Sequence, residues 1–412
     1  MAQQHLDPTD PTAAGPVAVD ALAGYLRARA TEFLRALRLH RETGGGAAGG
    51  SEESVDAARA LRRAARRISG TLHTFRPLLD ETWAEELRPE LAWLSGTLAR
   101  EHAYRARLDR LLQALHRLSP EAAAGSRAAG TDAAAGTRTT GTDAAAGTRT
   151  TGTDAAAGSR AAGAARVGAA APATGGTVPH PPAPAPAPTR DRGNGNGNGN
   201  GNGNLTVGAA KAGALLDRQL TLARTRAHST ALEALGSSRF HAVADKVAVL
   251  ASDVPLAPTA HTTAPHPLAA AAEERLTDAV AALPLVTAGS PYNAAALVHG
   301  LSPDPSPHPQ DTPWHQVRLL LRLHRYAQEA LLVADAEGAP VDVRLLAAGR
   351  ALDRHRDASE AAAAAAAAAR TPRIAPATAY ALGVLHADQR HEVEAARFAF
   401  QQAWQMQAIG AN

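Results

Sequence analysis

A row of side chains that can carry positive charge runs along the stretch TPWHQVRLLLRLHRYAQEALL, which begins at Thr312. Its members stand at offsets 0, 3, 7 and 10 and are His315, Arg318, Arg322 and Arg325. On a helix these offsets place the four side chains within an arc of about 80°, with apolar residues on the far side. Guanidinium groups in a row suit a chain of phosphates, because each can donate two hydrogen bonds without losing its charge. His315 would add a contact that depends on pH.

A second and weaker copy of the row lies nearer the amino terminus. When Phe75 is set against Leu331, the residues that fall on His315, Arg318 and Arg322 are Arg59, Arg62 and Arg66. The same helix face is widened by Arg63, Arg67 and His73. Ser69 stands where the other copy has Arg325, so one position of this copy is weakened. The repetition indicates that two parts of the chain share one design.

Three other interpretations of these basic faces stay open. Charged helix faces are common, so the row can be solvated surface or pair with acidic residues such as Glu85, Glu86 and Glu90. A nucleic acid is the rival polyanion, but proteins that bind single strands stack bases on aromatic rings, and only 3% of this chain is aromatic. The third interpretation is a helical protein-interaction scaffold whose basic faces are incidental. His315 can likewise be a capping or packing residue.

The composition argues against several classes of protein. The chain has 412 residues, a formal net charge of +3 and no cysteine, which excludes disulfides, thiolate metal sites and cysteine nucleophiles. No secretion signal or bilayer-spanning apolar run is visible, so we expect a cytoplasmic protein without a membrane partner. A GxGxxG spacing at Gly44, Gly46 and Gly49 follows a helical pattern where a dinucleotide site needs a strand. The 17 histidines are scattered and common catalytic motifs are missing, so we expect no enzyme, no cofactor and no metal.

The elements that must position the basic rows are helices. Apolar residues recur at spacings of three and four from about residue 20 to 118, and again from 205 to the end, where the final stretch predicts one long helix or a helix pair. Between them lie an eleven-residue repeat of GTDAAAGTRTT, a Pro-Ala run and six Gly-Asn copies that end at Asn204, a composition that predicts disorder. We therefore predict an all-α protein of packed helical bundles with roughly ten helices and no strand.

Several segments resemble one known family, the CHAD domain (conserved histidine α-helical domain), in which two helices carry a histidine followed by basic residues at offsets 3, 7 and 10. LLDETWAEELRPELAWLSGTLA is similar to the segment after the first basic helix, and ALEALGSSRFHAVADKVAVLASDVPLAP to the middle portion. ALDRHRDA, with His355 and Asp357, and ATAYALGVLHADQ, with the distal Phe400 and Trp404, resemble the last two helices. His355 is interpreted as structural or ion-paired.

The resemblance implies two pseudo-symmetric helical bundles with a basic surface that binds inorganic polyphosphate, without catalysis. The chain is then divided into a disordered terminus (1–16), a first half (17–118), a disordered insertion (119–204) and a second half (205–410). Arg59 replaces the first family histidine, and His102-Ala103 replaces the usual Arg-Asp pair, which implies weaker binding by the first half or binding through arginine charge alone. A location at polyphosphate granules would follow.

Overall fold

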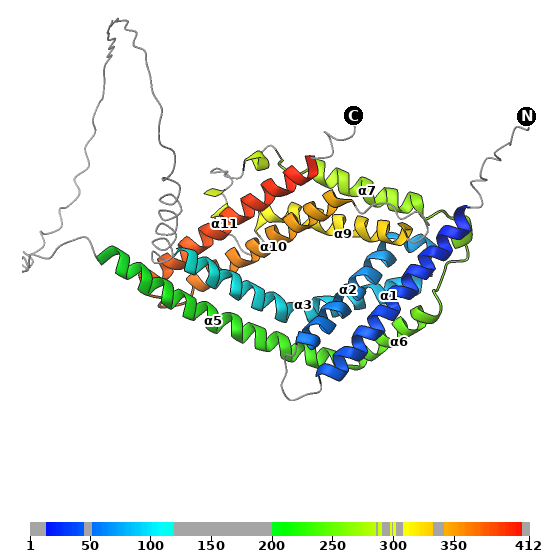
Figure 1. The fold of residues 1–412 in the computed structure, drawn as a ribbon, viewed down its shortest axis with the longest axis horizontal. Coiled ribbons are helices and arrows are strands. Elements are labelled where there is room, and N and C mark those ends of the chain that lie inside the picture. Colours follow the sequence, from blue (N-terminus) through cyan, green and yellow to red (C-terminus); the bar gives the residue numbers. More distant parts are fainter. Residues whose placement is uncertain are drawn as a thin grey trace, which may run out of the picture. The chain divides into compact units, whose positions relative to one another are not determined.

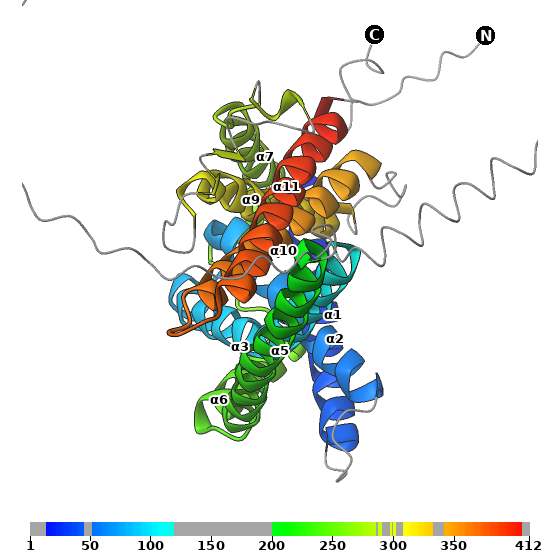
Figure 2. The same ribbon diagram turned by 90° about the vertical axis from the view of Figure 1, so that its left-hand side faces the viewer.

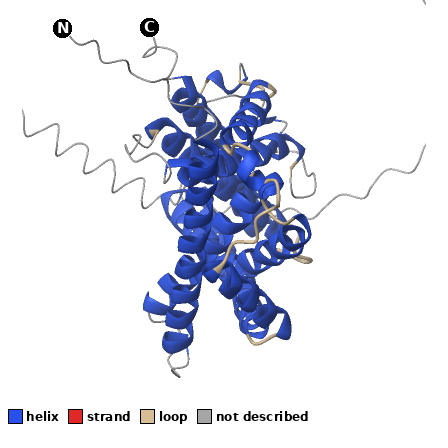
Figure 3. Ribbon diagram, turned by 90° about the vertical axis from the view of Figure 1, so that its right-hand side faces the viewer, coloured by secondary structure: helices blue, strands red, loops and turns tan. Residues whose placement is uncertain are grey.

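The computed structural model describes residues 14–44, 52–118, 200–285, 287–290, 297, 298, 300, 301, 308–332 and 342–405. The α-helices named in it are α1 (Ala14–Gly44), α2 (Glu52–Thr74), α3 (Glu81–Leu118), α5 (Asn200–Leu235), α6 (Ser238–Ser252), α7 (His266–Ala281), α9 (Thr312–Leu332), α10 (Val343–Ala369) and α11 (Pro376–Gln405). The described residues contain no strand, only an isolated bridge between Leu79 and Leu256, so the predicted all-α class is confirmed (Figure 3). None of the described helices is long and apolar enough to cross a membrane.

Two helix starts differ from the sequence prediction. The segments predicted to be disordered were 1–16 and 119–204, but α1 already begins at Ala14 and α5 at Asn200. The last Gly-Asn residues therefore form the first turn of a 36-residue helix. Extending an established helix is easier than nucleating one, which offsets the poor helix propensity of glycine and asparagine over so short a stretch. The remainder of both predicted disordered segments lies outside the described residues, and the final stretch is one helix, α11.

Capping residues in the sequence mark the starts of α6 and α10. Ser237 precedes α6, and its hydroxyl accepts a hydrogen bond of 3.2 Å from the backbone N–H of Phe240. Asp342 precedes α10 in the same way and accepts a 2.8 Å hydrogen bond from the N–H of Arg344. Each side chain satisfies a helix N–H that has no partner within the helix.

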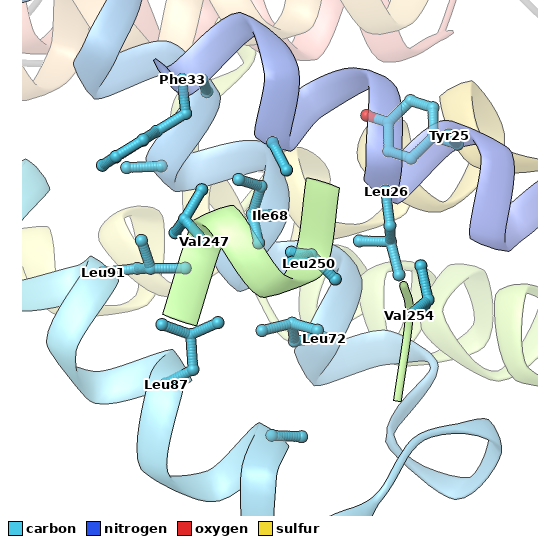
Figure 4. Packing of buried hydrophobic residues seen from close by; sticks show 14 of the residues in the cluster. Tyr25, Leu26, Phe33, Ile68, Leu72, Leu87, Leu91, Val247, Leu250 and Val254 are labelled. Atoms are coloured by element: carbon cyan, nitrogen blue, oxygen red, sulfur yellow. The ribbon is translucent and has the colours of Figure 1, made fainter. Parts of the chain in front are cut away.

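The first of three hydrophobic clusters joins α1, α2, the amino-terminal half of α3, and α6, and it also includes Ala327 and Ala330 of α9. Figure 4 shows Phe33 of α1, Ile68 of α2, Leu91 of α3 and Val247 of α6 meeting in this cluster. All four side chains are fully buried. Because α6 falls within the predicted second half of the chain, the two halves share a core.

Two further clusters lie along the longer helices. Trp314 of α9, Leu352 of α10 and Phe400 of α11 form the centre of the second cluster. The third contains Leu111 of α3 and Leu216 of α5, together with residues of α10 and α11, which run side by side in Figures 1 and 2. Since α3, α9 and α10 each contribute to two clusters, their middle turns are held firmly between apolar contacts.

The two helices that carry the basic rows, α2 and α9, cross closely at Gly70. A methyl group added at this glycine would lie 2.6 Å from Cδ2 of Tyr326 and 3.3 Å from a methyl group of Leu323. A side chain at position 70 would therefore force the helices apart, so the glycine sets how closely the two rows approach.

A buried ionic network ties the loop before α9 to α10 and α11. Asp311 is fully buried and accepts hydrogen bonds from Arg390 Nη1 (2.8 Å), Arg397 Nη2 (2.7 Å) and the Ser359 hydroxyl. Burial by itself would raise the pKa of Asp311, but the adjacent His355 and the hydrogen bond from the charged Arg390 outweigh it and hold the pKa well below its usual range. Losing one partner would leave a buried charge uncompensated, so the network resists rearrangement. It therefore fixes the position of Asp311, directly before α9.

His355 belongs to this network, as its interpretation as a structural or ion-paired residue requires. Its Nε2 lies 3.6 Å from Asp311 Oδ1 and accepts a 3.3 Å hydrogen bond from Arg397 Nε, while its ring stacks on Trp314. Burial lowers the pKa of His355 to about 4, although Asp311 opposes this shift. The imidazole is therefore neutral at pH 7.

Acid should destabilise the protein partly through His355. Between its ordinary pKa of 6.5 and its folded-state pKa of about 4, His355 takes up a proton only in the unfolded chain. Its contribution to stability is thus present above pH 6.5 and is lost as the pH falls, at no more than about 1.4 kcal/mol per pH unit. His355→Gln keeps an acceptor for Arg397 but does not titrate, so urea unfolding over this pH range should show a shallower loss of stability than in the wild type. His261→Gln in the exposed turn η2 (Ala260–Thr262) is the control, and parallel curves for wild type and His355→Gln would contradict the assignment.

Candidate anion-binding pocket

A cavity of about 410 Å³ opens where α2, α3, α9 and α10 face one another. Its lining residues are Arg62, Arg66, Ala99, His102, Ala103, Ala106, Arg107, Arg110, Arg318, Arg322, Asp353, Arg356, Asp357 and Glu360. Seven of them are arginines and three are carboxylates, so the lining carries a surplus of positive charge. We call this cavity the arginine pocket.

Helical periodicity explains how α2 and α9 each contribute two arginines to the arginine pocket. Arg62 and Arg66 are four residues apart, as are Arg318 and Arg322, so each pair projects from one face of its helix. The opposite faces are buried in apolar clusters, which prevents either helix from rotating about its own axis.

The carboxylates of the pocket all come from α10. Asp353, Arg356, Asp357 and Glu360 stand at offsets 0, 3, 4 and 7, which places them on one helix face. Arg356 Nε donates a 3.0 Å hydrogen bond to Asp357 Oδ1, and its Nε lies 3.8 Å from Glu360 Oε1. Arg107 of α3 also pairs with Glu360. The α10 face therefore holds both an arginine and the carboxylates that neutralise it.

On the α2 side the arginines have no such counterions. Among the described residues, neither Arg62 nor Arg66 forms an ion pair, and the Nε of Arg62 is buried without a hydrogen-bond partner. Burial and the charge of Arg62 lower the pKa of Arg66 to about 10, and burial with the charge of Arg356 lowers the pKa of Arg62. Both guanidinium groups remain charged at pH 7, in a place that disfavours their charge.

On the α9 side one carboxylate serves both arginines. Arg318 directs Nε and Nη2 at Asp353 Oδ1, at 2.6 and 2.5 Å, and Arg322 Nη2 lies 3.7 Å from the same oxygen. The side chain of Arg318 is only 16% exposed, whereas that of Asp353 is 56% exposed. Burial and the neighbouring Arg322 lower the pKa of Arg318 to about 10.

His102 of α3 faces the pocket from the third helix. Burial lowers its pKa, and the charges of Arg59, Arg62 and Arg105 lower it further, while Asp357 opposes them. The cations on α2 and α3 that surround the imidazole therefore favour its neutral form.

The structure brings together four of the ten predicted binding residues. Those that line the pocket are Arg62, Arg66, Arg318 and Arg322. His315 lies outside the lining, where its ring packs edge-on against His355 with ring centroids 5.5 Å apart. Arg325 lies outside it too, beside Gly349 of α10.

The other four predicted residues have separate surroundings. Arg59 pairs with Asp56 at 2.9 Å on the surface, and Arg63 is exposed. Arg67 donates a 2.8 Å hydrogen bond to Glu329 Oε2, which also accepts one from the Tyr25 hydroxyl. His73 lies at the far end of α2, with Nδ1 3.1 Å from Arg88 Nη1.

The alternative pairing partners that the sequence suggested are engaged elsewhere. Glu85 pairs with Arg88, Glu86 with Lys246 and Glu90 with Arg239. The carboxylate that meets the α9 row is instead Asp353, on a helix that follows the row in the chain. Arg318 and Arg322 are also largely buried, so the alternative interpretation of the row as solvated surface does not hold for these two residues.

Sequence reasoning missed the contribution of α3 and α10 to the pocket. Arg107, Arg110 and Arg356 gave no signal as isolated arginines, and His102 was noticed only as a departure from a family pattern. The signal available for α10 was the charged spacing of 0, 3, 4 and 7 from Asp353, which marks a polar face. Within the described part of the chain, no group of three or more histidine or carboxylate side chains can hold a metal ion.

Comparisons with known proteins agree with this architecture. A family model described as "CHAD domain" matches residues 13–190 and 202–334. A solved structure described as PptA from Streptomyces chartreusis is 59% identical, with a TM-score of 0.64, and the match covers 94% of this chain and 99% of that chain. No curated protein matches the chain. The family model reaches α2, α3 and α9 but ends before α10.

Because cations crowd the arginine pocket, we predict opposite effects on stability when each of two adjacent arginines is replaced. Arg66→Gln removes a buried cation without a counterion, so the ligand-free protein should gain stability, on the order of 1 kcal/mol. Arg67→Gln leaves Glu329 without its cation and should lose about 1–3 kcal/mol. Thermal melting of the two variants in ligand-free buffer measures both effects.

Each of these variants controls for the other, because both remove one arginine from the same turn of α2. Equal destabilisation by Arg66→Gln and Arg67→Gln would show that Arg66 is stabilised by its surroundings, contrary to the crowding described.

Proposed function

Because the chain belongs to the CHAD domain family, we propose that it binds inorganic polyphosphate in the arginine pocket and does not transform it. The observation that carries the proposal is the convergence of seven arginines from four helices on one cavity, two of them without a carboxylate partner among the described residues. A ligand that brings several negative charges would supply the missing counterions.

The donors of the pocket match phosphate oxygens in number and geometry. Guanidinium groups present paired N–H donors that fit phosphate in a bidentate arrangement. Their partial burial strengthens the attraction, since a charge pair in the pocket is less screened than one at the surface. Rigid positioning by the three apolar clusters also limits the entropy lost when the ligand binds.

Inorganic polyphosphate suits the pocket better than a nucleic acid does. Among the described residues that line it, none is phenylalanine, tyrosine or tryptophan, so bases would have no large ring on which to stack. The chain's Phe33 and Phe75 are buried in the first cluster. Inorganic polyphosphate consists of phosphate groups alone, so every part of it can bind to arginines.

The proposal excludes catalysis because of where the carboxylates are engaged. Asp353, Asp357 and Glu360 accept hydrogen bonds from Arg318, Arg356 and Arg107, so each carboxylate is already engaged by a guanidinium group. A general base must instead reach the proton that it removes from the attacking group.

Removing the two arginines of α2 should weaken polyphosphate binding and flatten its salt dependence. In Arg62→Gln/Arg66→Gln, each lost phosphate contact should reduce the slope of log affinity against log salt by about 0.7, the value for single-stranded nucleic acids, because fewer counterions are released. Isothermal titration with polyphosphate of defined length at several salt concentrations measures the slope.

The matched control for this titration is Arg35→Gln/Arg38→Gln, which removes two exposed arginines of α1 and changes the net charge equally. It should bind almost as the wild type does. Equal weakening by both double variants would reduce the binding to a general charge effect. Single-stranded DNA, titrated at equal salt, should bind more weakly than polyphosphate, and tighter binding of DNA would favour the nucleic-acid alternative.

Binding should also take up a proton at His102. A bound polyanion offsets the charges of Arg59, Arg62 and Arg105 that lower the pKa of this histidine, so its pKa rises on binding and affinity should increase as the pH falls toward and below 6.5. In His102→Gln this gain should shrink, whereas in His261→Gln it should persist. Titrations in buffers of different ionisation enthalpy report the proton directly, and an unchanged pH profile in His102→Gln would remove this residue from the site.

A further inference from the structure

We propose that Asp353 is a built-in competitor of the ligand and sets the shortest polyphosphate chain that the arginine pocket binds well. This inference rests on the proposed function, since it concerns the selectivity of the same pocket.

Asp353 occupies the donors that a phosphate would need on α9. Both Nε and Nη2 of Arg318 point at Asp353 Oδ1, at 2.6 and 2.5 Å, so the forked face of this guanidinium is already in use. Arg322 lies 3.7 Å from the same oxygen. A phosphate that binds Arg318 through Nε and Nη2 must therefore displace this carboxylate or share these donors with it.

The α2 arginines have no such competitor. Arg62 and Arg66 face the same cavity without an ion pair among the described residues, and the charges that act most strongly on Arg62 are those of other arginines. The pocket thus contains one open pair of arginines, on α2, and one occupied pair, on α9. The half of the chain whose basic row is weaker in sequence provides the open pair, and this is where an incoming anion binds first.

The length of the polyphosphate chain decides whether the ligand reaches the occupied pair, Arg318 and Arg322. Asp353 is attached to α10, so it competes for Arg318 at the high effective concentration of an intramolecular group. A short anion that is satisfied by Arg62 and Arg66 has no further phosphate to exchange for the carboxylate. A longer chain anchored at Arg62 and Arg66 also offers its next phosphates intramolecularly, and it then competes with Asp353 on similar terms.

The exposure of Asp353 makes this exchange feasible. Its side chain is 56% exposed, so a displaced carboxylate can turn into water, where it is fully solvated. The arginine it leaves is 16% exposed and passes from one anionic partner to another. The match to the CHAD family model ends at residue 334. Asp353 therefore lies in a part of this chain that the family model does not cover.

The test compares Asp353→Asn with the wild type, using tripolyphosphate as the short ligand and a long polyphosphate of defined length. Without the competing charge, affinity for tripolyphosphate should rise on the order of tenfold, as one charge-assisted contact is gained. Affinity for the long chain should rise much less, because the wild type already makes the exchange. The affinity ratio between long and short chains therefore falls in Asp353→Asn.

Two variants control this comparison. Asp245→Asn on the exposed face of α6 makes the same change in net charge and should leave the ratio as in the wild type. Asp353→Glu keeps the competing charge and should also keep a high ratio. Asp353→Ser is a second neutral variant, which gives the same answer if Asp353→Asn folds poorly.

The outcomes separate this inference from the function on which it rests. If wild type and variants bind no polyphosphate of either length, the proposed function is wrong. If polyphosphate binds but Asp353→Asn raises both affinities by one factor, the effect is general charge and the competitor is rejected. If Asp353→Asn weakens binding of either chain, Asp353 positions Arg318 for the ligand and does not compete with it.

Discussion

The repulsion among half-buried guanidinium groups is the constraint around which this molecule is organised. Arg62, Arg66, Arg318 and Arg322 lower one another's pKa, yet all four project into one cavity. Cations so placed would separate if their helices were free to move. They stay together because apolar clusters hold α2 and α9 in place and because Gly70 lets these two helices approach closely.

The two sides of the cavity relieve this repulsion differently. On α9 and α10, carboxylates neutralise the arginines and occupy their donors, with Asp353 shared by two of them. On α2 the charge is left uncompensated, which costs stability and leaves donors open for a ligand. A trade of stability for binding is common at functional sites. The buried Asp311 network holds the start of α9, and the His315 ring packs against His355, outside the pocket lining.

The sequence predicted what depends on neighbours along one helix. The rows on α2 and α9 follow from a period of 3.6 residues, and the all-α class follows from the same pattern. Contacts between helices were not predictable in this way. Nothing local marks Asp353 as the partner of Arg318, places Arg107 beside Glu360, or sends α6 into the core of the first half. The weaker basic row therefore seemed the weaker site, although it provides the open arginines.

We propose that polyphosphate enters the arginine pocket by way of α2. A crystal structure of the protein with a polyphosphate of defined length would show the route. We expect phosphate oxygens within hydrogen-bonding distance of the guanidinium groups of Arg62 and Arg66, with further phosphates toward Arg318. Phosphates bound instead to exposed arginines such as Arg35 and Arg38 of α1, with the pocket left empty, would contradict it.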